Sequence, residues 1–204
     1  ESNAQEIERV NEYAELSALM IEDYRKKWKQ PQLPFYFVQL SSIDTIKYKS
    51  QLWPQFRNEQ RKILQLIPNS GMAVCSDIGA KDYVHPANKK EVGERLARWA
   101  LNKTYKQNVV PSGPLPLKAT YSKGKVIVLF EHMAKGLKTT DGAAIRGFSV
   151  DGKNESEANF GDSGIIIPVS LKPQFIYYGW KPFSDGNLIN SENIPASTFK
   201  IEVQ

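Results

Sequence analysis

The fold class is decided by the stretch Met72-Ala73-Val74-Cys75-Ser76 together with the loop and the helix after it. This short apolar run predicts a buried strand. A polar loop over residues 77–87 comes next, and it contains Asp82-Tyr83-Val84-His85-Pro86-Ala87. A helix is then predicted over residues 88–103, where apolar residues recur at three- and four-residue spacing. A strand, a loop and a helix in this order are typical of an α/β protein.

The same alternation precedes this stretch. An amphipathic helix is predicted over residues 4–30, with Ser2 or Asn3 as its cap. An aromatic run predicts a strand over 35–40, and a second helix is predicted over 54–66. Alternating strands and helices at short spacing predict a parallel sheet with right-handed crossovers. Two strands alone do not make a stable domain of this kind, so we expect an N-terminal part of the domain to be missing from this chain.

The pattern changes after Tyr105. Residues 110–116 form a proline-rich linker, and short strands separated by Gly and Asp turns come after it. These strands are predicted over residues 119–121, 125–131, 145–150, 165–169 and 175–180. The predicted fold is therefore α/β, with part of a parallel-sheet domain over residues 1–108 and a small antiparallel β-sandwich over residues 109–204.

Composition and charge exclude several classes of protein. The net charge of +5 is mild, and the basic residues are scattered among 22 acidic ones, so we expect no nucleic-acid partner. No apolar stretch approaches the roughly 20 residues that a membrane span needs. The single cysteine excludes an intrachain disulfide. One cysteine and two widely separated histidines do not supply a zinc site, so no metal and no cofactor are expected.

His85 is the residue best suited to catalysis. It lies in the loop after a predicted strand, where ligands and catalytic groups collect in α/β proteins. An imidazole with an ordinary pKa near 6.5 can take a hydroxyl proton at neutral pH and return it to a leaving group. Asp82 or Asp77, in the same loop, could hold the imidazole in the required tautomer, and Asp82 is favoured because an aspartate three residues earlier can fold back on the histidine.

Other residues of catalytic type have simpler structural interpretations. His132 is expected at the end of a strand, and Cys75 inside one. Gly161-Asp162-Ser163-Gly164 looks like a hydrolase nucleophile turn, but it precedes a strand-rich region and predicts a β-turn. A serine at a mobile terminus, such as Ser2, does not hold a reactive geometry.

Several blocks of the chain occur in a recognisable order. They are Glu1-Ser2-Asn3-Ala4, Arg57-Asn58-Glu59-Gln60, residues 71–79, 82–89 and 91–97, and in the second half residues 112–115, 178–180, 186–190 and 194–199. In this order they resemble the blocks of the sialate O-acetylesterases, a family of SGNH hydrolases. The resemblance spans nearly the whole chain. Many relatives place the acid two residues before the histidine, whereas Asp82 is three before it, and Asp77 therefore stays an alternative acid.

The resemblance implies a three-layer, flavodoxin-like hydrolase domain and a serine esterase that removes acetyl groups from sialic acid or a related sugar. His85 would be the base, and Glu1, Ser2 and Asn3 would lie near the substrate. The nucleophilic serine would come from a missing N-terminal segment or subunit, so the chain alone would be inactive. The family's usual location implies a secreted, periplasmic or lysosomal protein. Two alternatives stay open: a non-catalytic carbohydrate-binding or assembly module, and an acetyl esterase acting on plant polysaccharide.

Overall fold

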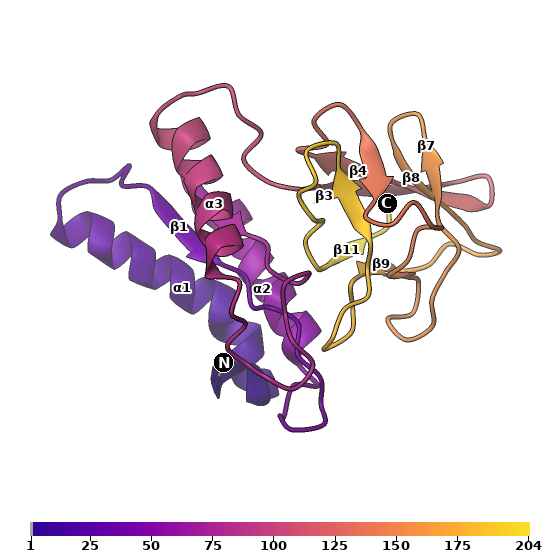
Figure 1. Ribbon diagram of the computed structural model, residues 1–204, viewed down its shortest axis with the longest axis horizontal. Coiled ribbons are helices and arrows are strands. Elements are labelled where there is room, and N and C mark those ends of the chain that lie inside the picture. The colour runs from indigo at the N-terminus through magenta and orange to yellow at the C-terminus, as the bar shows by residue number, and fades with distance from the viewer. Residues whose placement is uncertain (1) are drawn as a thin grey trace.

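The computed structural model describes residues 2–204, with helices gathered at one end of an elongated molecule and antiparallel strands at the other (Figure 1). The helical end contains a small parallel sheet, and the other end is built from antiparallel sheets. This mixed α/β organisation confirms the predicted change from alternating strands and helices to strands alone. Within residues 2–204, none of the helices combines the length and the apolar character needed to cross a bilayer.

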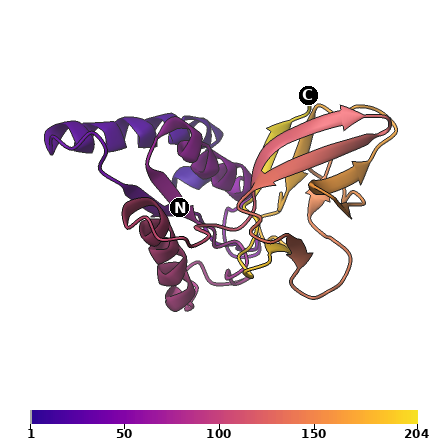
Figure 2. The same cartoon turned by 90° about the horizontal axis from the view of Figure 1, so that it is seen from above.

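The parallel sheet is formed by two strands that pair with Phe35 opposite Ser70 and Val38 opposite Ala73. Figure 2 shows two helices on one side of this pair and the third helix on the other side. The elements are, in chain order, α1 (Ile7–Lys27), β1 (Phe35–Val38), α2 (Trp53–Leu66), β2 (Ser70–Ala73) and α3 (Lys89–Trp99). The carboxyl ends of β1 and β2 therefore meet at one edge, as in other parallel sheets.

Helix α3 packs closely on β2 because the strand carries a glycine at the point of contact. A Cβ atom on Gly71 would lie 2.5 Å from the Trp99 ring, so no larger residue fits there without movement. The Trp99 indole Nε1 also donates a hydrogen bond of 2.8 Å to the Met72 carbonyl. Asn88 caps this helix by accepting a hydrogen bond from the Glu91 amide. These contacts fix the start and the tilt of the helix that follows the His85 loop.

The antiparallel part contains three sheets. The four-stranded sheet has the order β3-β4-β8-β7, the three-stranded sheet has the order β11-β9-β6, and β10 pairs with β5. The strands are β3 (Leu115–Ser122), β4 (Lys125–Glu131), β5 (Leu137–Thr139), β6 (Phe148–Ser149), β7 (Asn159–Gly161), β8 (Gly164–Pro168), β9 (Phe175–Tyr178), β10 (Leu188–Asn190) and β11 (Phe199–Glu202). Buried side chains of the two larger sheets, among them Val128, Ile165, Ile176 and Phe199, share one apolar cluster.

The two ends of the molecule are joined by buried polar contacts. Arg57, on α2, is fully buried, and its guanidinium donates hydrogen bonds to the carbonyls of Gly179, Lys181 and Pro182. Burial lowers the pKa of Arg57 to about 9, so the guanidinium keeps its charge at neutral pH. Carbonyl oxygens with partial negative charge thus solvate a buried cation in place of water.

Several predicted elements differ from the structure. The helix predicted over residues 4–30 is interrupted: a 3-10 helix (Ser2–Gln5) comes first, and α1 begins only at Ile7. Glu6, in extended conformation, occupies the N-cap position of α1, so neither Ser2 nor Asn3 caps it. The helix predicted to Lys103 changes after Trp99 into a π-helical turn (Ala100–Thr104). The hairpin at 122–124 is confirmed, and Asp162 and Ser163 form the predicted turn between β7 and β8.

Four strands were not predicted: β5, β7, β10 and β11. They have only three or four residues each. Such short segments cannot show a clear alternation of apolar and polar residues, and they become strands because a neighbouring strand offers hydrogen bonds. For the same reason the strand predicted over residues 145–150 shrinks to Phe148–Ser149, the part that pairs with β9.

Candidate active site

A cavity of about 240 Å³ opens at the carboxyl edge of the parallel sheet. Segment 38–41, which starts at the last residue of β1, forms one wall, and the loop after β2 forms the other. The lining residues that carry polar groups are Gln39, Ser41, Cys75, His85 and Lys89. This edge is where ligands bind in open α/β sheets, and it is the position predicted for His85.

His85 lies exposed at this cavity. Its ring meets Tyr83 edge-on, with 5.8 Å between the ring centroids. Val84, the residue before it, is partly buried and packs against the apolar cluster that also contains Ala4 and Ile43. The backbone of the loop is therefore anchored beside the histidine, while the imidazole itself stays accessible to a ligand.

Asp77, the alternative acid, is engaged elsewhere. Its carboxylate accepts two hydrogen bonds, of 2.6 and 2.7 Å, from the buried guanidinium of Arg95 on α3. Arg95 also donates to the Val74 carbonyl and to Glu91. Burial is the largest single effect and disfavours the charge on Arg95, but the hydrogen bond to Asp77 and the nearby negative charges, those of Asp77 and Glu91 among them, together outweigh it and raise the pKa of Arg95. Asp77 thus ties the loop after β2 to α3.

Asp82 has a weaker attachment. Its Oδ2 atom lies 3.3 Å from the Lys47 ammonium, and both side chains are largely exposed to solvent. Exposed ion pairs of this kind contribute about 1 kcal/mol or less. Among residues 2–204, neither Asp82 nor Asp77 forms a hydrogen bond with His85, so the choice of orienting acid stays a prediction.

The wall opposite His85 is positioned by two glutamines. Gln60, on α2, accepts a hydrogen bond from the Leu40 amide and donates one to the Val38 carbonyl, as a neighbouring strand would. Gln39 is fully buried and donates to the Arg57 carbonyl and to the Ser197 hydroxyl. Its Oε1 atom has no hydrogen-bond partner in the described chain. Segment 38–42 is therefore held rigidly where it borders the cavity.

Sequence reasoning did not single out Gln39. The feature of the sequence that could have pointed to Gln39 is its polar side chain inside the otherwise apolar and aromatic run Phe35-Tyr36-Phe37-Val38-Gln39-Leu40. A buried polar side chain at the end of a parallel strand needs partners, and such groups often mark functional edges. The block Arg57-Asn58-Glu59-Gln60 stood out only as part of the family resemblance. The structure shows that its Arg and Gln both fix segment 38–42 and its surroundings.

The residues near the start of the chain lie beside the His85 loop but line a different cavity. Asn3 is exposed and contributes, with Arg9 and Tyr13, to a hollow of about 260 Å³ on α1. Glu1 and the side chain of Ser2 lie outside the described structure. The predicted contact of these three residues with substrate therefore stays a prediction.

Two further residues have structural roles. Cys75 follows β2 by two residues instead of lying inside a strand as expected, and it lines the His85 cavity. Burial raises the pKa of its thiol to about 12, so no thiolate is available at neutral pH. His132 directly follows β4, as predicted, and its ring packs edge-on against Trp99 at 5.5 Å. Burial lowers the pKa of His132. Within residues 2–204 no group of three or more His, Cys, Asp or Glu side chains is arranged to hold a metal ion.

Comparison with known proteins identifies the family. Residues 1–102 match the family model described as carbohydrate esterase, sialic acid-specific acetylesterase. The crystal structure of a carbohydrate acetylesterase from Xanthomonas citri is similar, with 32% sequence identity, a TM-score of 0.88 and 99% of this chain covered. The match covers 48% of that protein, so the chain spans about half its length. No curated protein sequence matches. Because the family model covers half of the chain, the protein belongs to the sialic acid-specific acetylesterase family of carbohydrate esterases.

Proposed function

We propose that this chain is the histidine-bearing part of a carbohydrate O-acetylesterase that uses a Ser-His-Asp mechanism. The observation that carries the proposal is the exposed His85 at a cavity on the carboxyl edge of a parallel sheet. Membership of a carbohydrate acetylesterase family supports the class of substrate. The substrate would be an acetyl ester on sialic acid or a related sugar, with acetylated plant polysaccharide as the alternative.

His85 would act first as a base and then as an acid. It would take the proton of a serine hydroxyl while the serine oxygen attacks the acetyl carbonyl, and would pass that proton to the departing sugar oxygen. Water would then attack the acetyl-serine, again through His85, to release acetate and restore the serine. No metal and no cofactor enter these steps.

Asp82 is the acid we assign to His85. A surface ion pair to Lys47 costs little to break, so the Asp82 carboxylate can turn toward the imidazole when substrate excludes water. Asp77 would first have to give up two short hydrogen bonds to a buried guanidinium. Removing one partner of such a pair strands a buried charge and costs several kcal/mol. This difference favours Asp82 over Asp77.

We place the nucleophilic serine in a segment outside this chain, as part of the same hydrolase domain. In the described residues, β1 and β2 pair only with each other, and both outer edges of the pair stay open. Leu16, Leu19 and Met20 on α1 are 56%, 62% and 44% exposed, which is unusual for the apolar face of a helix. Further strands and helices would cover these surfaces and complete a three-layer, flavodoxin-like SGNH domain.

The antiparallel sheets would then form a β-sandwich over residues 109–204 beside a hydrolase domain over residues 1–108. The shared apolar cluster of the two larger sheets supports this division, and the irregular segment between Thr104 and Leu115 supports its boundary. The extracytoplasmic location implied by the family is also a proposal. Detection of the protein in the medium or periplasm, rather than the cytosol, would test it.

The test is acetyl release by the protein that carries this chain together with the proposed serine segment. His85→Ala should lower kcat/KM by at least about a thousandfold. His132→Asn is the matched control, because asparagine tolerates the positive φ of 59° at that position, and it should keep nearly full activity. Equal loss in both variants, or retained activity in His85→Ala, would refute the role of His85. The isolated 204-residue chain should release no acetate.

Asp82 and Asp77 can be distinguished by the melting temperature of their variants as well as by kcat. Asp82→Asn should lower kcat by at least about a hundredfold and leave the melting temperature unchanged, because its ion pair with Lys47 is exposed. Asp77→Asn should lower the melting temperature, since it breaks the pair with Arg95. A large loss of kcat in folded Asp77→Asn, with Asp82→Asn fully active, would transfer the role to Asp77.

A further inference from the structure

A third cavity, of about 380 Å³, lies where the helical end meets the antiparallel end. Helix α2 contributes Gln55, Glu59 and Lys62 to one side, and the antiparallel part contributes Phe175, Trp180 and Lys200 to the other. None of the residues that line it also lines the His85 cavity. Its volume falls within the range of about 300–1,000 Å³ that small-molecule sites occupy.

The antiparallel side of this cleft presents aromatic rings. Along β9, Ile176 and Tyr178 point into the core, while Phe175 and Tyr177 are partly exposed on the opposite face. Their ring centroids lie 6.2 Å apart, and Tyr177 lies 5.1 Å from Trp180. The three partly exposed rings therefore form a row. Phe175 and Trp180, at its two ends, line the cleft, and Tyr177 lies between them.

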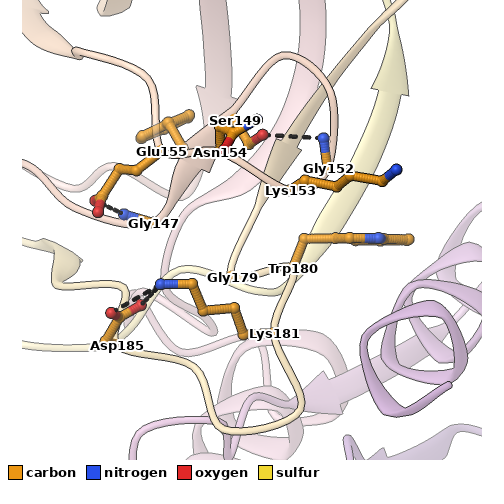
Figure 3. A pocket seen from close by; sticks show the side chains of 11 residues that line it. Gly147, Ser149, Gly152, Lys153, Asn154, Glu155, Gly179, Trp180, Lys181 and Asp185 are labelled. Carbon is orange, nitrogen blue, oxygen red and sulfur yellow. Dashed lines mark hydrogen bonds and ion pairs between the residues drawn. The ribbon is translucent and has the colours of Figure 1, made fainter. Parts of the chain in front are cut away.

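Trp180 is held from behind by a rigid loop. Figure 3 shows Lys153 running alongside the Trp180 indole in the neighbouring pocket. A Cβ atom on Gly152, which has a φ of +74°, would lie 3.2 Å from Tyr177 and 3.4 Å from Trp180, so the loop passes close to both rings and leaves little room for a side chain at this position. Asp151 stiffens the loop by accepting hydrogen bonds of 2.8 Å from the amides of Lys153 and Asn154. One side of Trp180 is thus backed by this loop, and the indole also lines the cleft.

The helical side of the cleft presents polar groups that both donate and accept hydrogen bonds. Glu59 accepts from Lys62 at 2.7 Å through Oε1, which leaves Oε2 without a partner in the described chain. Gln55 donates to Asn11 Oδ1 at 2.7 Å, which leaves its Oε1 available in the same way. On the facing wall the Lys200 ammonium lies 4.0 Å from the Phe175 ring centroid, and no carboxylate of the described residues pairs with it.

We propose that this cleft binds a pyranose unit of a glycan, as a saccharide subsite separate from the His85 cavity. A pyranose has an apolar face of C–H groups and a rim of hydroxyls. The C–H face suits the electron-rich face of an aromatic ring, and hydroxyls both donate and accept hydrogen bonds. Trp180 would stack on the ring while Gln55, Glu59 and Lys62 bind the rim. The carbohydrate class rests on the proposed function.

The test is binding of soluble oligosaccharides to the folded chain, measured by titration calorimetry and tryptophan fluorescence. Two probes separate the sources of the pyranose: xylohexaose, which is neutral, and sialyllactose, which carries a carboxylate. Trp180→Ala should weaken binding by about tenfold, the size expected for loss of one stacked ring. Trp28→Ala is the matched control, because Trp28 is 61% exposed and lies outside the cleft.

A second pair of variants keeps the inference testable if Trp180→Ala fails to fold. Gln55→Ala should weaken binding a fewfold, whereas Gln65→Ala, on an exposed position of the same helix, should not. His85→Ala should leave binding at the cleft unchanged, which separates this inference from the catalytic proposal. The inference is overturned if neither probe binds, if Trp28→Ala or Gln65→Ala weakens binding equally, or if His85→Ala abolishes it.

Discussion

The most decisive test of the architecture is Arg57→Met. Arg57 is fully buried, yet no carboxylate of the described residues pairs with it. Its guanidinium instead donates to three backbone carbonyls of segment 179–182 and, at 3.4 Å, to the Ser42 hydroxyl. Methionine has a similar length but no charge and no donor. The variant therefore removes the polar junction between the two ends of the molecule while filling most of the same space.

The cost can be worked out from these contacts. A hydrogen bond to a charged group contributes about 1.5–3 kcal/mol to stability. The three bonds to carbonyls would therefore contribute about 4.5–9 kcal/mol if nothing offset their loss. Relief of the buried charge offsets part of this loss, since burial already lowers the pKa of Arg57 from 12.5 to about 9. We therefore expect a loss of about 3–5 kcal/mol. For a chain of 204 residues this corresponds to a fall in Tm of about 6–20 °C.

The assay is urea and thermal unfolding monitored by circular dichroism, with hydrogen exchange at two amides. The Ile43 amide donates to the Pro182 carbonyl and the Ser184 amide donates to the Ser42 hydroxyl, so both should lose protection in Arg57→Met. Arg9→Met is the matched control, because its ion pair with Glu6 is exposed and contributes about 1 kcal/mol or less. A Tm change in Arg57→Met no larger than in Arg9→Met would refute the reasoning.

Three further predictions concern single residues. Cys75, whose thiol pKa is raised by burial to about 12, should react with a disulfide reagent at pH 8 only after unfolding; labelling of the native protein at the rate of a free thiol would contradict this. Hydrogen bonds from Arg146 and Asn187 lower the pKa of Asp141 to about 2, so its stabilising effect is present above the unfolded-state pKa near 4 and is lost as pH falls toward 2. Asp141→Asn should therefore flatten the dependence of Tm on pH in that window, and an unchanged slope would count against the assignment. Gly79→Ala should destabilise strongly, because a Cβ would lie 2.0 Å from the Ser42 carbonyl oxygen, whereas Gly93→Ala, with open space in α3, should stabilise by about 0.5–1 kcal/mol; equal Tm values for the two variants would show that Gly79 is not tightly packed.

The parallel half of the fold was predictable because its signals are local. The apolar spacing of α2 and α3 and the aromatic run of β1 each lie within one segment, and each was placed within a few residues. The antiparallel half was predictable only as a class. Strands such as Leu188–Asn190 exist because Leu137–Thr139 lies beside them, and that neighbour is about fifty residues away in the chain.

The candidate site divides in the same way. His85 was found from its residue type and its place after a strand, both of which the sequence displays. The partners of Asp77 and Asp82 could not be found, because Arg95 and Lys47 are brought to them by α3 and by the loop after β1. Asp82 and His85 are three residues apart in the sequence, but this spacing does not reveal that Lys47 is the cation that pairs with Asp82 in the folded protein.

The sequence by itself determined the order of strands and helices in the parallel half, the loop that carries the histidine and, through its blocks, the family. The tertiary structure decided which polar groups meet. Arg57 and Gly179 are 122 positions apart, and Gln39 and Ser197 are 158 apart, yet both pairs are buried and hydrogen-bonded. Periodicity is a property of neighbouring residues, whereas a buried polar group finds its partner wherever packing brings one. The junction and the cleft beside it therefore became visible only in the folded chain.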